Sequence, residues 1–288
     1  MHEASAEALA ALGQSTRLSV FRLLARRCPG TVAASEIAAA LGVMPNTLST
    51  HLDILVRNRL IERERHGRSI LYCLDIEGAA ALIGYLAADC CRGRPDICAV
   101  PAEIAQQPAV GAASATAEKQ AMTLLFICTG NSARSIIAEA IMNDTGNGRF
   151  RAFSAGTHAR SEPDPRALMM LRKNGYDIDG LRSKSLAEFQ DPDAPALDFV
   201  ITVCDRSANE ECPPWPGQPL TGHWGVPDPV KVQGTEAEID LALDQAFRMI
   251  RDQIASFAAL PIETLDRVSV QQRIDQIGRS IEAPLPMA

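Results

Sequence analysis

The residues best suited to chemistry run from Cys128 to Ser135, in the order Cys-Thr-Gly-Asn-Ser-Ala-Arg-Ser. Five residues separate Cys128 from Arg134, which is enough for a loop that curls with its backbone N–H groups inward. Inward N–H groups at a helix N-terminus bind anions, and the same field favours the thiolate form of a cysteine. Arg134 adds a planar guanidinium that matches a tetrahedral oxyanion. The spacing therefore predicts a nucleophile inside an oxyanion-binding loop.

Strands and helices alternate around this loop. The apolar run from Met122 to Ile127 predicts a buried strand before it, and residues 135–142 have a helical pattern after it. Further along come a strand at 150–154, a helix at 165–174, a near-continuous apolar strand at 197–203 and a long helix at 239–259. This order predicts an α/β doubly wound parallel sheet, with the loop at the carboxyl end of a strand, where such sheets bind ligands.

The loop resembles the phosphate loop of low-molecular-weight protein tyrosine phosphatases, and even more that of the arsenate reductases that share their fold. The resemblance covers about residues 122–260. It implies an oxyanion-binding loop made of Thr129, Gly130, Asn131, Ser132, Ala133, Arg134 and Ser135. Ala133 stands where many relatives have a cysteine, so a thiol at that position is not obligatory.

Two further cysteines favour the reductase branch of this family. Cys204 ends the buried strand, and Cys212 follows eight residues later in a polar stretch. The pattern resembles the three-cysteine, thioredoxin-coupled arsenate reductases. That resemblance implies that Cys128 attacks arsenate, that Cys204 attacks Cys128 and releases arsenite, and that Cys212 carries the disulfide outward to thioredoxin, with glutaredoxin as the alternative reductant.

Residues 223–229 contain a second matching stretch, which ends in Val-Pro-Asp-Pro. It resembles the general-acid loop of the family and implies that Asp228 protonates the leaving oxygen. Val230 and Lys231 follow where phosphatases usually carry tyrosines, which argues against an aromatic pocket for phosphotyrosine. The resemblance implies no organic cofactor, but some members of the family bind potassium, and the matching positions are Asn131, Glu139 and Ser154.

The N-terminal third has the pattern of a DNA-binding module. Two helices are expected within residues 5–27, with Leu9, Leu12, Leu18, Phe21 and Leu24 inward. A short helix at 35–41, the turn at Gly42 and a helix at 46–56 predict a helix-turn-helix. Small polar residues suited to base edges and phosphates lie at the start of the last helix: Asn46, Thr47, Ser49, Thr50 and His51.

A basic hairpin and a further helix follow. Residues 61–74 predict a β-hairpin with Gly67 at its tip, and Arg65 and Arg68 are placed to reach the DNA backbone. Residues 76–89 predict a helix with a narrow apolar seam, which favours a homodimer. Residues 5–98 resemble the ArsR-type winged-helix repressors, which implies binding to double-stranded operator DNA.

Three thiols close this segment at Cys90, Cys91 and Cys98. Adjacent cysteines have Cα atoms about 3.8 Å apart, below the usual range for a disulfide. Three soft thiolates with no nearby His suit a thiophilic ion that accepts three ligands, such as As(III) or Sb(III). The arrangement resembles the subgroup of these repressors that senses arsenite through a Cys pair and a third Cys after the dimer helix.

The whole-chain numbers suit two domains: 288 residues, 47% of them hydrophobic, and a net charge of −7. We expect a winged helix-turn-helix at 1–98, a flexible linker at 99–121, a reductase domain at 122–260 and a tail at 261–288. The sequence has no apolar run of ~18 residues, so we expect no membrane span. Eight cysteines without a leader segment favour a reducing cytoplasm.

Two alternatives stay open for the C-terminal half. It could be a protein tyrosine phosphatase attached to a thiol-sensing regulator, or a domain that binds an oxyanion without catalysis. The two additional cysteines, Cys204 and Cys212, favour the reductase over both.

Overall fold

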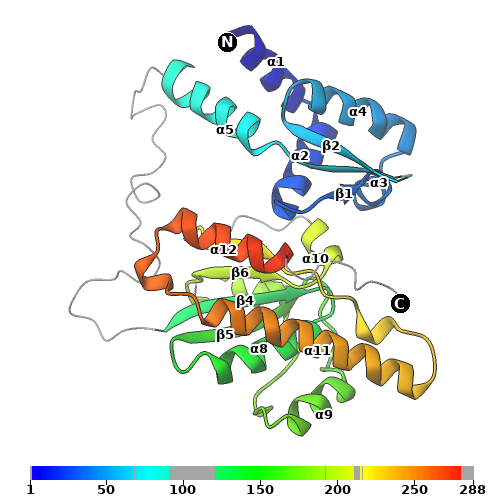
Figure 1. The fold of residues 1–288 in the computed structure, drawn as a ribbon, viewed down its shortest axis with the longest axis vertical. Coiled ribbons are helices and arrows are strands. Elements are labelled where there is room, and N and C mark those ends of the chain that lie inside the picture. The colour runs from blue at the N-terminus through cyan, green and yellow to red at the C-terminus, as the bar shows by residue number, and fades with distance from the viewer. Residues whose placement is uncertain are drawn as a thin grey trace. The chain divides into compact units, whose positions relative to one another are not determined.

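The computed structural model of the chain describes residues 2–67, 69–90, 121–191, 193–210, 215 and 217–279. The chain divides into two compact units, Met1–Gln107 and Pro108–Ala288 (Figure 1). The expected linker at 99–121 lies almost wholly outside the described residues. In the described part of the chain, no helix is long and apolar enough to cross a membrane.

The first unit contains helices and one small antiparallel sheet. Its elements are α1 (His2–Leu12), α2 (Ser15–Arg27), β1 (Val32–Ala33), α3 (Ala34–Leu41), α4 (Pro45–Arg57), β2 (Ile61–His66), β3 (Ser69–Leu74), α5 (Ile76–Tyr85) and η1 (Leu86–Cys90), a π-helical turn. The sheet order is β1-β3-β2. Gly42 ends α3 with φ +63°, in the left-handed region that favours glycine, and the chain turns there into α4. The predicted helix-turn-helix with a hairpin wing is confirmed.

The buried stripe of the first two helices differs from the prediction. Leu9 and Leu18, expected inward, are exposed. In α2 the buried residues are Val20, Leu23, Leu24 and Arg27, a series with helical spacing that leaves Leu18 outside it. In α1 the small residues Ala8 and Ala11 are buried instead of leucines.

The second unit contains a four-stranded parallel sheet in the order β5-β4-β6-β7. Its elements are β4 (Met122–Cys128), α8 (Arg134–Thr145), β5 (Phe150–Gly156), α9 (Pro165–Lys173), η2 (Leu186–Phe189), β6 (Phe199–Thr202), α10 (Asp205–Asn209), β7 (Leu220–His223), η3 (Pro229–Lys231), α11 (Glu236–Ala258), η4 (Ile262–Thr264) and α12 (Arg267–Arg279). The predicted parallel α/β fold is confirmed. β7 has no counterpart in the sequence prediction, because its four residues include a glycine and a histidine and give no apolar run.

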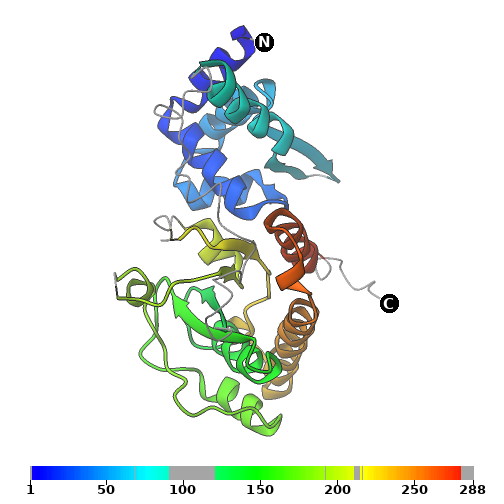
Figure 2. The ribbon, with the colours of Figure 1, turned by 90° about the vertical axis from the view of Figure 1, so that its left-hand side faces the viewer.

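Alternate side chains of the central strand β4 pack into two different hydrophobic cores. Leu124 and Phe126 pack on the side of α8, α9, α11 and α12, whereas Leu125 and Ile127 pack with η2 on the other face. Figures 1 and 2 show α11 and α12 along the same side of the sheet. The buried positions of α9 are Ala167 and Leu171, four residues apart, and Met169 between them is exposed.

The segment expected as a tail is part of this unit. Val270, Ile274 and Ile277 of α12 belong to the same core as β4 and α8. Trp224 Nε1 donates to the carbonyl oxygen of Ile274 (3.1 Å). Helix and strand approach closely at Gly222, where a Cβ would lie 2.3 Å from Ile274 Cγ2. The domain boundary predicted at residue 260 therefore falls inside the fold.

We expect Ile274→Ala to lower the unfolding free energy of this unit by about 2–5 kcal/mol, because it leaves a cavity between α12 and β7. Urea unfolding followed by tryptophan fluorescence measures the change. Val268→Ala on the same helix is the matched control: Val268 is 67% exposed and Ile274 is 0%. The control should shift stability by no more than about 0.5 kcal/mol. Equal losses in the two variants would contradict the placement of α12 in the core.

Candidate functional site

The loop from Cys128 to Ser135 leaves the carboxyl end of β4, between β5 and β6, where the strand order reverses. Its carbonyl groups are held by donors outside the loop. Those of Cys128, Thr129, Gly130 and Ser132 accept the backbone N–H groups of Thr157 (3.1 Å), His158 (2.8 Å), Arg160 (2.8 Å) and Asp164 (2.8 Å). A trans peptide directs its N–H opposite to its C=O. Fixing the carbonyls outward therefore turns the N–H groups inward, as an anion site requires.

Cys128 is buried and its sulfur has two hydrogen-bonding partners within the loop. Asn131 N–H donates to Cys128 Sγ (3.1 Å), and Ser135 Oγ lies 3.0 Å from the same sulfur. Ser135 Oγ also accepts a hydrogen bond from Asn131 Nδ2 (2.8 Å), which fixes this hydroxyl beside the sulfur. Donors around a sulfur stabilise negative charge on it, which is the form that attacks.

Arg134 and Asp228 meet beside this loop, although they are 94 positions apart in the sequence. Arg134 Nη2 donates to Asp228 Oδ2 (2.8 Å), and Nη1 donates to the carbonyl oxygen of Val226 (3.0 Å). Asp228 Oδ1 accepts the backbone N–H of Val230 (3.2 Å), which caps the short turn after it. The guanidinium is thus fixed in one orientation, and the predicted acid lies next to the predicted oxyanion binder.

Cys204 also lies against the loop. Its sulfur is 3.4 Å from Thr129 Oγ1 and 3.1 Å from Ser207 Oγ, and the side chain is buried. The register of β6 beside β4 produces this approach, since Thr202 pairs with Ile127 just before the two cysteines. Two of the three predicted relay cysteines are therefore brought to one place. The third, Cys212, lies outside the described residues.

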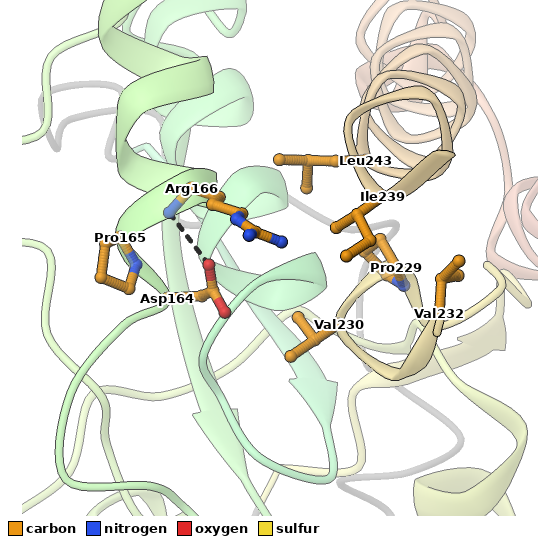
Figure 3. Close-up of a pocket in the computed structure, with 8 residues that line it drawn as sticks. All are labelled: Asp164, Pro165, Arg166, Pro229, Val230, Val232, Ile239 and Leu243. Atoms are coloured by element: carbon orange, nitrogen blue, oxygen red, sulfur yellow. Dashed lines mark hydrogen bonds between the residues drawn. The ribbon is translucent and has the colours of Figure 1, made fainter. Parts of the chain in front are cut away.

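A cavity of about 260 Å³ is lined on one side by Pro229, which follows Asp228 in the chain (Figure 3). It is lined by the start of α9, the residues that follow Asp228 and the first turns of α11. None of the eight described residues that line it is aromatic, and Val230, Val232, Ile239 and Leu243 form its apolar wall. An aliphatic wall lacks the ring stacking that a phosphotyrosine site uses.

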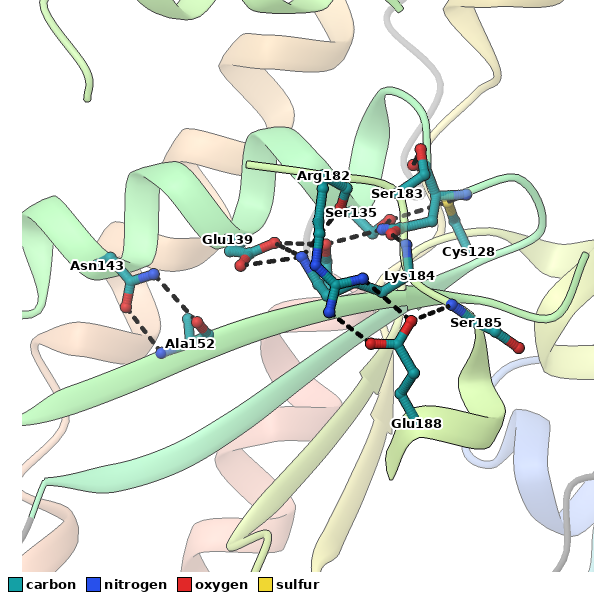
Figure 4. A network of polar contacts seen from close by, with 12 residues as sticks. Cys128, Ser135, Glu139, Asn143, Ala152, Arg182, Ser183, Lys184, Ser185 and Glu188 are labelled. Carbon is teal, nitrogen blue, oxygen red and sulfur yellow. Dashed lines mark hydrogen bonds and ion pairs between the residues drawn. The ribbon is translucent and has the colours of Figure 1, made fainter. Parts of the chain in front are cut away.

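Behind the loop is a buried polar network that the sequence analysis missed in part (Figure 4). Asn131 has φ +44°, a conformation strained for a residue with a side chain. Its Nδ2 donates to Ser135 Oγ (2.8 Å) and Ser154 Oγ (2.7 Å), and its Oδ1 accepts Lys184 N–H (2.6 Å). Lys184 Nζ pairs with Glu139 Oε2 (2.9 Å). Lys184 belongs to no motif recognised in the sequence, so its place in this network could be found only from the structure.

These positions do not fit a potassium ion in the arrangement present. A cation needs several oxygen lone pairs directed at one point. Here the oxygens of Asn131, Glu139 and Ser154 already accept hydrogen bonds from protein groups, and Glu139 faces an ammonium group. The structure brings together the three matching positions, Asn131, Glu139 and Ser154. Lys184 lies among them, and its ammonium group contacts the Glu139 carboxylate.

The first unit exposes the polar start of α4. Asn46, Thr47, Ser49 and Thr50 are exposed and His51 is half-buried, while Leu48, Leu52 and Leu55 on the opposite side are buried. Arg65 on β2 is exposed, with its Nε donating to the carbonyl oxygen of Gly67 (3.3 Å). Arg68 lies outside the described residues. The start of α4 thus presents an exposed face of small polar side chains, the chemistry by which recognition helices contact bases and phosphates.

The predicted thiol cluster is described only at Cys90, which is exposed at the end of η1. A hydrogen bond to Cys90 is the main reason that the pKa of Tyr85 is raised to about 12. Cys91 and Cys98 lie outside the described residues. Along the preceding helix, Ile76 and Ile83 are 58% and 66% exposed, whereas Ala79 and Leu82 pack inward. The predicted apolar seam is therefore only partly exposed: Ala79 packs in this unit's own core, whereas Ile76 and Ile83 lie on its surface.

Comparisons with known proteins match both halves. The model of the low molecular weight phosphotyrosine protein phosphatase family matches residues 123–270, and a helix-turn-helix domain model matches residues 12–64. These matches confirm the two resemblances found in the sequence.

Curated relatives and solved structures resemble the second unit. An arsenate reductase of Bacillus licheniformis is 36% identical over 133 residues, which are 46% of this chain and 88% of that protein. An arsenate reductase of Oceanobacillus iheyensis is 35% identical over 136 residues, 47% of this chain and 94% of that protein. A solved structure described as an arsenate reductase in the phosphate binding state is 27% identical, with a TM-score of 0.37, and the match covers 46% of this chain and 97% of that one.

Proposed function

The chain belongs to the low molecular weight phosphotyrosine protein phosphatase family, and from that premise we propose that its second unit is an arsenate reductase. The observation that carries the proposal is the buried Cys204, whose sulfur lies 3.4 Å from a side chain of the oxyanion loop. A phosphatase needs one cysteine, whereas a reductase needs a second thiol that can reach the first. The curated relatives named as arsenate reductases support this choice.

In the first step, arsenate enters the loop and its oxygens accept the inward N–H groups and the Arg134 guanidinium. The Cys128 thiolate attacks arsenic and forms an S–As bond. One oxygen leaves as water after it receives a proton, a role that we assign to Asp228 beside Arg134. Arsenic remains As(V) in this step, and the loop holds the negative charge of the thioester-like adduct.

In the second step, the Cys204 thiolate attacks Cys128 Sγ. The new S–S bond forms as the S–As bond breaks, and the electron pair of that bond passes to arsenic. Arsenic is reduced to As(III) and leaves as arsenite, while the two thiols are oxidised to a disulfide. Cys212 then attacks Cys204 and releases Cys128 as a thiolate, and thioredoxin reduces the Cys204–Cys212 disulfide, with glutaredoxin as the alternative.

A single-turnover measurement tests this sequence of steps. The reduced intact chain is mixed with arsenate without a reductant, and arsenite and free thiols are counted. About one arsenite per chain, with the loss of two thiols among Cys128, Cys204 and Cys212, is expected from the balance of electrons. Hydrolysis of an aryl phosphate with no arsenite formed would favour the phosphatase alternative, and arsenate bound unchanged would favour an oxyanion-binding domain.

We propose further that the first unit is an arsenic-responsive repressor that binds operator DNA as a homodimer. The exposed polar start of α4 supports contact with DNA, and the exposed Ile76 and Ile83 support a partner helix in a dimer. As(III) or Sb(III) bound by Cys90, Cys91 and Cys98 would favour the dimer state that does not bind DNA. The chain would then sense the ion that its second unit makes.

Arsenite is expected to weaken DNA binding by the intact chain by about 5- to 150-fold, the usual size of coupling between two sites. Fluorescence anisotropy with a duplex selected from random-sequence DNA measures the affinity. Cys90→Ser should lose the response, whereas Cys73→Ser should keep it, because Cys73 is half-buried in the hairpin. An unchanged affinity of the unaltered chain in arsenite would refute the sensor.

A further inference from the structure

The ammonium group of Lys184 occupies the centre of the polar network behind the oxyanion loop (Figure 4). Lys184 Nζ lies 2.9 Å from Oε2 and 3.2 Å from Oε1 of Glu139, and it donates to the carbonyl oxygen of Arg182 (3.0 Å). Lys184 is 6% exposed and Glu139 is 8% exposed. An ammonium group has three donors, and these contacts use all of them.

A chain of hydrogen bonds connects the Lys184–Glu139 pair to Asn131 of the loop. Ser154 Oγ donates to Glu139 Oε2 (2.5 Å) and accepts Asn131 Nδ2 (2.7 Å). The segment around Lys184 also holds Asn131 directly, since Lys184 N–H donates to Asn131 Oδ1 (2.6 Å) and Ser183 Oγ donates to the Asn131 carbonyl oxygen (2.7 Å). Asn131 in turn keeps its strained φ of +44° and donates its N–H to Cys128 Sγ.

We propose that Lys184 is a built-in cation that does for this loop what a bound potassium ion would do, so that the protein works without potassium. Lys184 is a positioning residue: it holds the Glu139 carboxylate in one orientation, and Glu139 and Ser154 keep Asn131 in the conformation that directs its N–H at Cys128. A second monovalent cation beside Lys184 would face repulsion from the ammonium in a poorly solvated site. The inference rests on the proposed reductase only for its turnover measurement, because the loop can be tested by oxyanion binding alone.

The test compares potassium chloride with choline chloride at equal ionic strength. For the intact chain and each variant, we would measure the melting temperature of the second unit, its increase on adding arsenate, and arsenate turnover. Lys184→Ser removes the ammonium and leaves room for an ion, whereas Lys184→Met fills the same room with an apolar side chain. Arg182→Ser is the matched control, because the Arg182 guanidinium pairs with Glu188 at the surface.

The unaltered chain and Arg182→Ser should show the same melting temperature, arsenate response and turnover in both salts. Lys184→Ser should lose its arsenate response in choline, with turnover down at least about tenfold, and recover both in potassium. Its melting temperature should rise with potassium, because an ion that binds only the folded state stabilises it. Lys184→Met should be impaired in both salts.

A potassium-dependent rise in turnover or melting temperature of the unaltered chain would overturn the proposal, and this holds even if Lys184→Ser fails to fold. An undiminished arsenate response of Lys184→Met would overturn it too. Absence of turnover in every protein, together with a potassium-specific rise in the melting temperature of Lys184→Ser, would refute the reductase and leave the role of Lys184 intact.

Discussion

Cys204→Ser is expected to lower steady-state arsenate reduction by at least about 10³-fold, the scale seen when a group that forms a covalent bond in a reaction is removed. Serine can keep the contact that the sulfur makes with Thr129 Oγ1, so the loop should stay intact. Its hydroxyl cannot attack the Cys128 sulfur to form a disulfide, so the adduct on Cys128 has no route to arsenite. Arsenite formation in the presence of thioredoxin, its reductase and NADPH measures the effect.

The control for this loss is Cys73→Ser. Cys73 is half-buried in β3 of the other unit, and burial is the main cause that raises the pKa of its thiol, so it stays protonated and unreactive. Its replacement should leave reduction unchanged. Arsenate binding by Cys204→Ser should also persist, because Cys128 and Arg134 are untouched. A Cys204→Ser protein that still turns over arsenate would mean that the electrons do not pass through this thiol.

Arg134→Lys is expected to lower kcat/KM for arsenate by about 10²–10³-fold, the usual effect of removing one preorganised oxyanion donor. Arg134 is fixed by the Val226 carbonyl oxygen and by Asp228, and its planar group can still face the oxyanion. A lysine ammonium is a single point charge on a flexible stem and cannot hold both contacts and the substrate. Steady-state kinetics and arsenate affinity from thermal shifts measure the change.

Arg149→Lys separates this role from the general effect of losing a guanidinium. Arg149 binds the carbonyl oxygens of Ala258 and Leu260 and pairs with Glu263, all away from the loop. That variant should lose some stability but keep its affinity for arsenate. Equal arsenate affinities in Arg134→Lys and the unaltered chain would contradict the assignment of Arg134 to the oxyanion.

The loop and the helix-turn-helix could be predicted because each is specified by neighbouring residues. Cys128 and Arg134 are six positions apart in a strand–loop–helix, and the turn at Gly42 lies between two short helices. Asp228 could be found only through its resemblance to a family, since an Asp-Pro pair is also an ordinary turn. Its approach to Arg134 is a property of the fold, not of local sequence.

The features that could not be predicted depend on tertiary contacts. β7 is a strand because β6 lies beside it, and its residues Gly222 and His223 have little preference for strands by themselves. α12 has an apolar stripe, but the sequence alone does not predict that this stripe packs against Trp224 and Gly222. Lys184 has the sequence context of a surface lysine, and only its burial beside Glu139 reveals a role in the loop.

The most direct test of the central claim is arsenate-dependent NADPH oxidation by the intact chain with thioredoxin and thioredoxin reductase. We expect one arsenite to form for each NADPH oxidised, with no oxidation when arsenate is omitted, because two electrons reduce each arsenate. No arsenite from the intact chain, either with thioredoxin or with glutaredoxin and glutathione, would contradict the claim. The second unit would then be an oxyanion-binding or phosphatase domain, and the relay of Cys128, Cys204 and Cys212 would be wrong.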